Sequence, residues 1–102
     1  MAEHNEIIHQ SIRLKIMSVL NAMPAGEGLD FLRLKAIARV TDGNLSTHLA
    51  TLEKAGYISI KKDFVGKRTR TRAAITRAGR RAFEAHLLFL RDIIAGEIPD
   101  EE

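Results

Sequence analysis

The chain of 102 residues contains no cysteine, which excludes a disulfide framework and any metal site built on thiolates. It has no run of about 18 apolar residues, so the sequence predicts no membrane-spanning helix. The N-terminus also lacks a basic segment followed by an apolar run, and we therefore expect no signal peptide. From these absences we expect a cytoplasmic protein.

Internal repeats, a linker and a catalytic constellation are missing as well. The four histidines, at positions 4, 9, 48 and 86, are scattered, and none has a carboxylate nearby at the spacing of a metal site or a catalytic triad. His9 and His86 lie on the first and last predicted helices and could approach each other, although a single histidine on a helix is far more often a packing or surface residue. We therefore predict neither an enzyme nor a metal site, and no cofactor.

The chain does contain enough apolar material for one small core. Hydrophobic residues make up 45% and charged residues 28% of the sequence, which are ordinary values for a globular domain. At this length we expect a single domain over residues 1–96 and a disordered acidic tail over residues 97–102. A core of this size is marginal, and association into oligomers would bury additional apolar surface.

Basic residues are concentrated in one part of the chain. The segment from Lys54 to Arg81 contains ten basic residues and one acidic residue, Asp63, so it carries a charge of +9 while the remainder carries −6. An asymmetry of this size indicates contact with a polyanion. The alternative is a basic surface that is merely solvated.

Apolar residues recur at helical spacing in three stretches of the N-terminal half. The sequence therefore predicts helices over residues 7–23, 31–38 and about 42–55. Pro24 ends the first helix, and Thr41 or Asp42 can cap the third by accepting hydrogen bonds from its free N–H groups. The segment before the second helix is either a short extended stretch or a cap at Asp30. The last two helices and their turn form a helix-turn-helix.

The C-terminal half changes to a β pattern before a final helix. Residues 57–61 and 70–76 alternate and are rich in β-branched side chains, and the segment between them contains Gly66, so a two-stranded hairpin with a basic tip is predicted. Thr76 then caps a long helix over about residues 77–95, which carries two adjacent apolar stripes. The expected fold class is mainly α with a small β-hairpin (α+β).

This order of elements resembles that of the winged helix-turn-helix proteins. The residues that carry the likeness run from Thr41 to Ile58 and are similar to the recognition helix and first wing strand of MarR- and ArsR-like bacterial regulators. Segments 66–70 and 75–80 are similar to the wing and the final-helix entry of a short, stand-alone subgroup. The resemblance implies a winged helix-turn-helix with a long C-terminal helix that binds double-stranded DNA and regulates transcription.

Two properties of those regulators are not carried over to this chain. The metal-sensing members of the ArsR group use cysteines or paired helical ligands, which are missing here. The larger MarR-type proteins build a ligand pocket between subunits from additional helices, which this sequence also lacks. The sequence therefore identifies no small-molecule effector, and it specifies neither the target DNA nor the direction of regulation.

The exposed face of the third helix is the predicted base-reading surface. With Leu45, Leu49 and Leu52 in the core, short and medium polar side chains remain near the N-terminal half, the part that enters the major groove in a helix-turn-helix protein. We also expect no acidic residue on this face after Asp42. The residues expected to read bases are Asn44, Ser46, Thr47, His48 and Thr51.

The basic hairpin over residues 61–72 supplies the electrostatic part of the binding. Its cations neutralise phosphates and release counterions, and an arginine at its tip can enter a narrow minor groove. We therefore assign affinity to the hairpin and sequence preference to the helix. The residues expected on the DNA backbone are Lys54, Lys62, Lys67, Arg68, Arg70 and Arg72. The alternative function is a protein-interaction module whose basic hairpin docks on an acidic partner.

The two apolar stripes of the last helix predict a homodimer. They cover more of the helix than one small core can use, so one stripe can pair with its counterpart and with the first helix across a two-fold axis. A dimer also matches DNA half-sites about 34 Å apart. The alternative is that the first helix of the same chain covers both stripes. The residues expected in the dimer interface are Ile8, Ile12, Phe83, His86, Leu87, Phe89, Leu90, Ile93 and Ile94.

Overall fold

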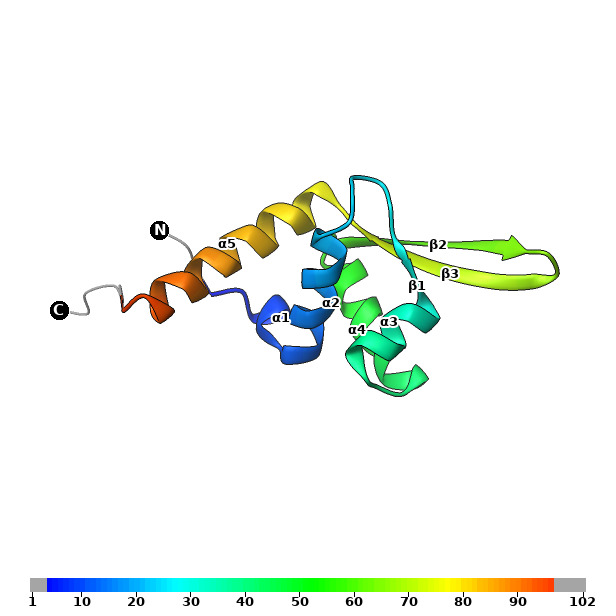
Figure 1. Cartoon of the computed structure of the whole chain (residues 1–102), viewed down its shortest axis with the longest axis horizontal. Coiled ribbons are helices and arrows are strands. Elements are labelled where there is room, and N and C mark those ends of the chain that lie inside the picture. The colour runs from blue at the N-terminus through cyan, green and yellow to red at the C-terminus, as the bar shows by residue number, and fades with distance from the viewer. Residues whose placement is uncertain (1–3, 97–102) are drawn as a thin grey trace.

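A group of helices packs on the base of a small sheet, and a hairpin and one helix project from this body in opposite directions (Figure 1). The computed structural model describes residues 4–96, so the tail predicted over residues 97–102 lies outside the described residues. The molecule measures 60 Å along its longest axis and 26 and 21 Å along the other two. The elements in chain order are α1 (Glu6–His9), α2 (Ser11–Asn21), β1 (Leu29–Asp30), α3 (Phe31–Ala38), α4 (Asp42–Lys54), β2 (Ile58–Val65), β3 (Arg68–Ile75) and α5 (Arg77–Ile94).

Local cap chemistry starts the helices where the sequence predicts. The hydroxyl of Thr41 accepts a hydrogen bond from the N–H of Asn44 (3.2 Å) at the start of α4, and that of Thr76 accepts from Gly79 (2.9 Å) at the start of α5. Asp30 belongs to β1 and also caps α3, so the segment is both a short extended stretch and a helix cap. The expected class, mainly helical with a small antiparallel sheet, and the helix-turn-helix order are confirmed.

The single helix predicted over residues 7–23 is instead two helices. Gln10 has an extended backbone (φ −60°, ψ 130°), and its side-chain oxygen accepts a hydrogen bond from the N–H of Ile12 at 2.8 Å. Gln10 is therefore the cap of α2, while Asn5 caps the short α1 by accepting from the N–H of Ile8. Glutamine is not among the preferred helix caps, and the apolar spacing continues through the break.

The hairpin is longer than predicted and gains a third strand. β2 and β3 pair antiparallel along all eight residues of each, and β1 adds to the other edge of β3. Gly66 and Lys67 form the turn, and Gly66 has a φ of +65°, a conformation that favours glycine. β1 can approach β3 closely because Gly28, just before it, has no Cβ. A Cβ at that position would collide with the carbonyl oxygen of Ala73. The segment 62–69, predicted as a connection, is thus mostly strand.

The core lies between the helices and the base of the sheet. The predicted stripe of α4 is buried there, because Leu45, Leu49 and Leu52 are at most 3% exposed. From the sheet, Ile58 and Ala73 close the other side of the core. Within the part of the chain that the structure describes, no helix is both long and apolar enough to span a membrane.

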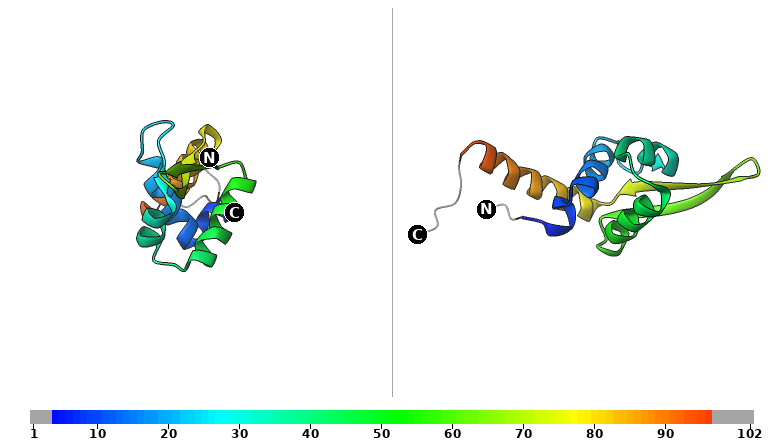
Figure 2. Two further views of the ribbon diagram at one scale, coloured as in Figure 1. Left: turned by 90° about the vertical axis from the view of Figure 1, so that its right-hand side faces the viewer. Right: turned by 90° about the horizontal axis from the view of Figure 1, so that it is seen from below.

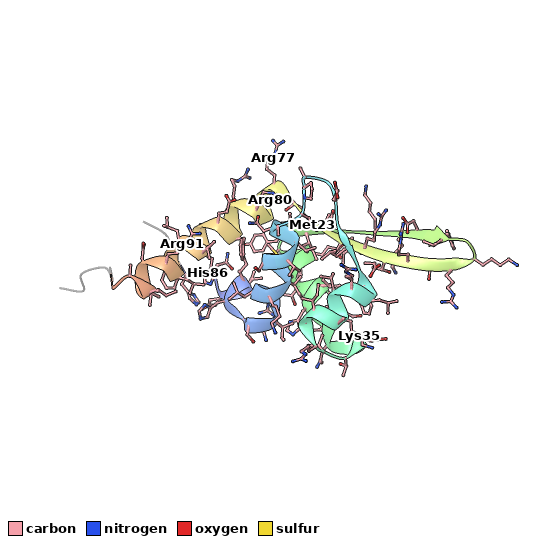
Figure 3. The ribbon with its side chains drawn as sticks, in the orientation of Figure 1. Met23, Lys35, Arg77, Arg80, His86 and Arg91 are labelled. Atoms are coloured by element: carbon pink, nitrogen blue, oxygen red, sulfur yellow. The ribbon has the colours of Figure 1, made fainter. Side chains whose placement is uncertain are left out.

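α5 is held against the body along its first half, from Arg80 to His86. The guanidinium of Arg80 donates to the carbonyl oxygens of Asn21 (2.8 Å) and Met23 (3.1 Å), which satisfies backbone groups at the C-terminal end of α2 (Figure 3). Beyond this anchor the helix runs away from the sheet, so that its last turns lie at the end of the molecule opposite the hairpin (Figure 2). The C-terminal part of α5 is therefore available to another surface.

A cluster of histidines fills the contact between α1 and α5. His86 is fully buried, its Nδ1 accepts a hydrogen bond from the N–H of Asn5 (3.1 Å), and its Nε2 lies 3.1 Å from Nδ1 of His9. Because Nδ1 is an acceptor, the proton is on Nε2 and is donated to His9, so His86 is neutral. The ring of His4 lies 4.3 Å from that of His9. Among the described residues, no group of three or more histidine and carboxylate side chains is placed to hold a metal ion.

The buried His86 predicts that the fold loses stability in acid. Burial and then the neighbouring His9 and His4 lower the pKa of His86 below its ordinary value of 6.5. A histidine that is harder to protonate in the folded state contributes stability that is complete above its unfolded pKa and is lost as the pH falls through its folded pKa. We therefore expect the urea midpoint of unfolding to fall between about pH 7.5 and about pH 5.

The matched variant for this test is His86→Gln. Its amide can accept from Asn5 and donate to His9 but does not titrate, so its urea midpoint should fall less over the same range. An equal fall in both proteins would show that His86 is not the source of the acid sensitivity.

Candidate nucleic-acid interface

The turn between α3 and α4 contains an ion pair and a residue with a left-handed backbone conformation. Nζ of Lys35 on α3 lies 2.6 Å from Oδ1 of Asp42 in the first turn of α4 (Lys35 is labelled in Figure 3). α3 ends at Arg39, which adopts the left-handed conformation (φ 58°) and donates its N–H to the carbonyl oxygen of Lys35 (2.8 Å). These contacts close the turn between α3 and α4, whose buried faces share the core through Leu34, Leu45 and Leu49, so that the opposite face of α4 is directed outward.

α4 exposes the side opposite its buried leucines. At 3.6 residues per turn, Thr47, Ala50 and Lys54 lie about half a turn away from that stripe, and all three are exposed. Asn44, near the start of the helix, is exposed beside them. Asn44, Thr47 and Lys54 are therefore exposed on the outer part of α4, as the helical spacing predicted.

Two of the predicted base-reading hydroxyls already use their protons within the helix. Oγ1 of Thr47 donates to the carbonyl oxygen of Gly43 (3.0 Å), and Oγ1 of Thr51 donates to that of Thr47 (3.1 Å). Thr51 is also half-buried, whereas Thr47 is exposed. Both oxygens keep lone pairs, so these residues can accept a hydrogen bond but cannot also donate one.

His48 lies at the flank of the exposed face, beside α2. It is half-buried, and Nη1 of Arg13 donates to its Nδ1 (3.1 Å) while Nε of Arg13 donates to the carbonyl oxygen of Ile7 (2.6 Å). Burial, and secondarily the charge of Arg13, lower the pKa of His48, so its imidazole is neutral at neutral pH. His48 therefore lies one turn after Asn44, on the side of α4 that faces α2, and it is half-buried whereas Asn44 and Thr47 are exposed.

The other flank of α4 faces the sheet and carries an acidic residue. Ser46, Ala50 and Glu53 line a crevice of about 430 Å³ together with residues of β2 and β3, among them Lys62. Glu53 is exposed, so the expectation of no acid on this face after Asp42 is wrong. The sequence carried the signal, because Glu53 is seven residues after Ser46, two turns along the same side.

One carboxylate organises the arginines on the sheet face away from α4. Asp63 on β2 accepts hydrogen bonds from Nε and Nη2 of Arg70 (3.1 Å each), which lies directly opposite, and from Nη2 of Arg72 (2.9 Å). The hydrogen bond from Arg70, followed by the charges of both arginines, holds the pKa of Asp63 below its usual range. Arg70 and Arg72, predicted on the DNA backbone, are thus already engaged, and the three side chains together carry a single positive charge.

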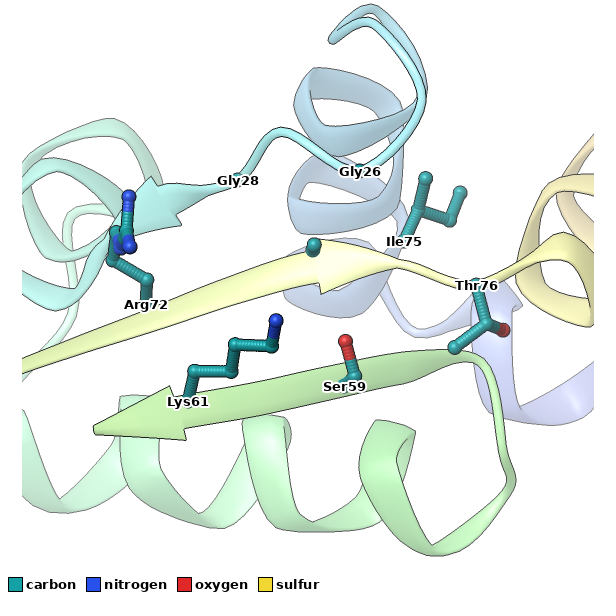
Figure 4. Close-up of a pocket in the computed structure, with 8 residues that line it drawn as sticks. Gly26, Gly28, Ser59, Lys61, Arg72, Ile75 and Thr76 are labelled. Carbon is teal, nitrogen blue, oxygen red and sulfur yellow. The ribbon is translucent and has the colours of Figure 1, made fainter. Parts of the chain in front are cut away.

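The remaining cations of the hairpin lie nearer its tip. Lys62, Lys67 and Arg68 are exposed, and within the described residues they form no ion pair. Lys61 is also exposed but stands on the face away from α4, where it lines a hollow of about 200 Å³ with Arg72 and the loop that precedes β1 (Figure 4). The unpaired charge on the α4 side and at the tip therefore comes mainly from Lys62, Lys67 and Arg68.

Three residues expected in a dimer interface belong to the core of the single chain. Ile8 and His86 are 0% exposed and Phe83 is 5% exposed, because α1 and α2 of the same chain cover this stripe of α5. Ile12 and Leu87 are half-buried and pack against the same core. The alternative, in which the first helix of the same chain covers both stripes, therefore describes the first half of α5, where Phe83 of one stripe and His86 of the other are buried, but not its far end.

The far end of α5 keeps an apolar surface that this core does not cover. Three apolar side chains in this part of α5 are exposed: Leu88 at 49%, Ile93 at 44% and Ile94 at 85%. Leu88 was not among the residues expected in the dimer interface. Phe89 and Leu90 are half-buried beside them. The four consecutive apolar residues 87–90 signalled a broad apolar surface, but the two-stripe interpretation left Leu88 outside both stripes.

Comparison with known proteins agrees with this geometry. Residues 12–94 match the family model of the winged helix DNA-binding domain. An uncharacterized protein of Methanocaldococcus jannaschii is 35% identical over 82 residues, which cover 80% of this chain and 86% of that protein. The structure of a transcriptional regulator homologue from Pyrococcus horikoshii OT3 is similar with a TM-score of 0.80 and 28% identity, over 90% of this chain and 88% of that one.

A structure solved with DNA also shares the fold. FabT of Streptococcus pneumoniae, crystallised in complex with DNA, is similar with a TM-score of 0.58 and 19% identity, over 94% of this chain and 68% of that chain. The family match spans α3, α4, the hairpin and all of α5, and it confirms the resemblance to winged helix-turn-helix proteins. The chain belongs to the family of winged helix DNA-binding domains.

Proposed function

We propose that this protein is a transcriptional regulator that binds specific sequences of duplex DNA. α4 would enter the major groove, and the hairpin of β2 and β3, called the wing from here on, would contact phosphates or the minor groove. The observation that carries this proposal is the joint presence of an exposed polar face on α4 and an exposed basic wing tip in a chain of the winged helix DNA-binding family. A polar helix face without the wing would be an ordinary surface helix.

The hydrogen-bond partners within α4 narrow what each side chain would read. Asn44 is exposed and can pair with adenine through two hydrogen bonds. Thr47 and Thr51, whose protons are held by the helix backbone, would accept from the amino groups of cytosine or adenine, or contact a thymine methyl. Because Arg13 occupies Nδ1 of His48, the proton of that ring is on Nε2, the atom left to donate to a phosphate or a guanine.

The protein would act as a homodimer joined through the far end of α5. Leu88, Ile93 and Ile94 are exposed apolar residues on a helix that extends beyond the body, and a second copy is the occupant that a two-fold DNA site requires (Figure 2). Pairing these ends would leave the two wings and the two α4 helices on the outside. The two α4 helices would then meet successive major-groove segments about 34 Å apart.

The first prediction separates base reading from phosphate binding. Fluorescence anisotropy with duplexes selected from a random pool, across a salt series, should show a steep salt slope and more than about tenfold sequence preference. Arg68→Ala should weaken binding to all duplexes alike and reduce the slope by about one unit, whereas Thr47→Ala should change which sequences are preferred. Arg91→Ala, which removes a cation from the opposite end of the molecule, is the control and should change neither (Figure 3).

Two outcomes would contradict this assignment. Failure of the protein to bind any duplex at low salt would rule out the DNA-binding proposal, and an acidic protein partner would become the better explanation of the wing. Identical behaviour of the Arg68 and Thr47 variants would show that α4 and the wing do not divide the task.

A second prediction concerns the carboxylate of the wing. Asp63→Asn removes the anion that holds Arg70 and Arg72, so both guanidiniums become available to phosphates, and we expect tighter binding with a salt slope that is steeper by about one unit or more. Glu84→Gln makes the same change of charge on α5 and should leave the slope unchanged. Weaker binding of the Asp63 variant would mean that the ion pairs are needed to shape the wing.

The dimer is tested by sedimentation at about micromolar concentration, where a specific dimer should persist. We expect the unmodified chain to sediment as a dimer and Leu88→Asp with Ile94→Asp to sediment as a monomer, because each places an uncompensated charge in an apolar contact. Leu32→Asp is a matched control, since Leu32 is 75% exposed on α3 and lies outside the proposed interface. A monomeric unmodified chain would refute the dimer.

A further inference from the structure

The tip of the wing exposes apolar side chains in the middle of its cations. Phe64 is 72% and Val65 is 55% exposed, at the end of β2 directly before the Gly66 turn. Lys67 and Arg68 follow on the other side of that turn and are exposed as well. A phenylalanine this exposed contributes little to the packing of the isolated chain, and it stands beside cations that form no ion pair within the described residues.

The strand register places Phe64 on the α4 side of the wing. Along β2, Phe64 alternates with Lys62 and Ile60, and Ile60 packs against the core while Lys62 lines the crevice beside α4. Val65 stands on the opposite face, across from Arg68. Phe64 therefore extends the surface that α4 begins, whereas Val65 does not.

The reach of the wing is of the same order as the distance between two grooves. Phe64 lies four residues beyond Ile60, the last residue of β2 that packs on the core, which is about 13 Å at a rise of about 3.3 Å per residue. The major and minor grooves alternate along a helical repeat of about 34 Å, so neighbouring groove centres lie about 17 Å apart. With α4 in the major groove, the wing tip would thus come to the adjacent minor groove (Figure 1 shows the wing projecting past α3 and α4).

The chemistry of the tip fits that groove better than it fits a protein surface. The minor groove has apolar sugar walls between two rows of phosphates, and phenylalanine is among the side chains that insert there and part the bases. At the tip, Lys62 precedes Phe64 on the same face, Lys67 stands in the turn that follows, and Arg68 lies on the opposite face of the hairpin. An acidic protein would pair with the cations but would leave the ring without an apolar partner.

We propose that Phe64 is a minor-groove contact residue, which packs its ring between the sugar walls of duplex DNA while Lys67 and Arg68 hold the flanking phosphates. This inference rests on the proposed function, because it places α4 in the neighbouring major groove. It adds an apolar, salt-independent contribution to a wing that composition alone describes as electrostatic.

Phe64→Ala tests the inference in the full-length chain. Anisotropy with a duplex of about three helical turns should show about tenfold weaker binding at every salt concentration and an unchanged salt slope, because an apolar contact releases no counterions. The same duplexes made with inosine in place of guanine lack the amino group in the minor groove and keep the major-groove edge. The unmodified protein should bind the inosine duplexes at least about threefold more tightly, and Phe64→Ala should lose most of that gain.

Val65→Ala is the matched control, because it shortens an exposed apolar side chain on the opposite face of the same turn. It should keep the wild-type response to inosine. If Phe64→Ala binds both duplexes as the unmodified protein does, or if it changes the salt slope as Arg68→Ala should, the inference is overturned while the proposed function stands. If the unmodified protein binds no duplex, both fall together.

Discussion

The placement of α4, the wing and α5 relative to one another depends on one set of contacts, where Gly56 and Tyr57 meet Thr76 and Gly79. The N–H of Thr76 donates to the carbonyl oxygen of Tyr57 (2.9 Å), and its hydroxyl donates to that of Gly56 (2.6 Å) while accepting from the N–H of Gly79 (2.9 Å). Gly56 and Tyr57 connect the end of α4 to the start of β2, and Thr76 connects the end of β3 to the start of α5. Because Gly79 has no Cβ, the first turn of α5 rests directly on the Tyr57 carbonyl, so the angle between α5 and the wing has little room to vary.

The same junction is connected to the N-terminal segment through the Tyr57 side chain. Nδ2 of Asn5 donates to the Tyr57 hydroxyl (3.0 Å), while the backbone N–H of Asn5 donates to His86 on α5. Asn5 thus fastens α1 across the first half of α5, and this contact buries the stripe that was expected to face a second copy. Within residues 4–96, the large apolar side chains of α5 that stay exposed lie where the helix passes beyond α1, at Leu88, Ile93 and Ile94, and this is where we place the proposed dimer contact. The division of α5 between core and free surface is therefore decided by where α1 ends.

Local features with a preferred chemistry were predicted from the sequence, and the pairing of side chains across strands was not. Thr76 was identified as a cap, and Thr41 as one of two candidates, because cap chemistry acts over about three residues, whereas the pairing of Asp63 with Arg70 required the strand register. The break at Gln10 is local as well, but it was missed because glutamine is not a preferred cap and the apolar spacing continues through it. His48 is a different case. It follows Leu45 by three residues and precedes Leu52 by four, so helical spacing alone places it beside the buried stripe.

The position of Asp63 also decides how the charge of the wing is used. A partly exposed ion pair contributes little to stability, so phosphates can compete with the carboxylate for Arg70 and Arg72 at small cost. The cations at the tip would meet DNA from the first encounter, whereas these two arginines would contribute only where a phosphate replaces Asp63. Phosphate contacts add affinity without direct sequence information. If α4 and the wing bind DNA as we propose, Asp63 would limit the part of binding that is blind to sequence by restraining two arginines, and a larger share of the discrimination would fall to the exposed face of α4.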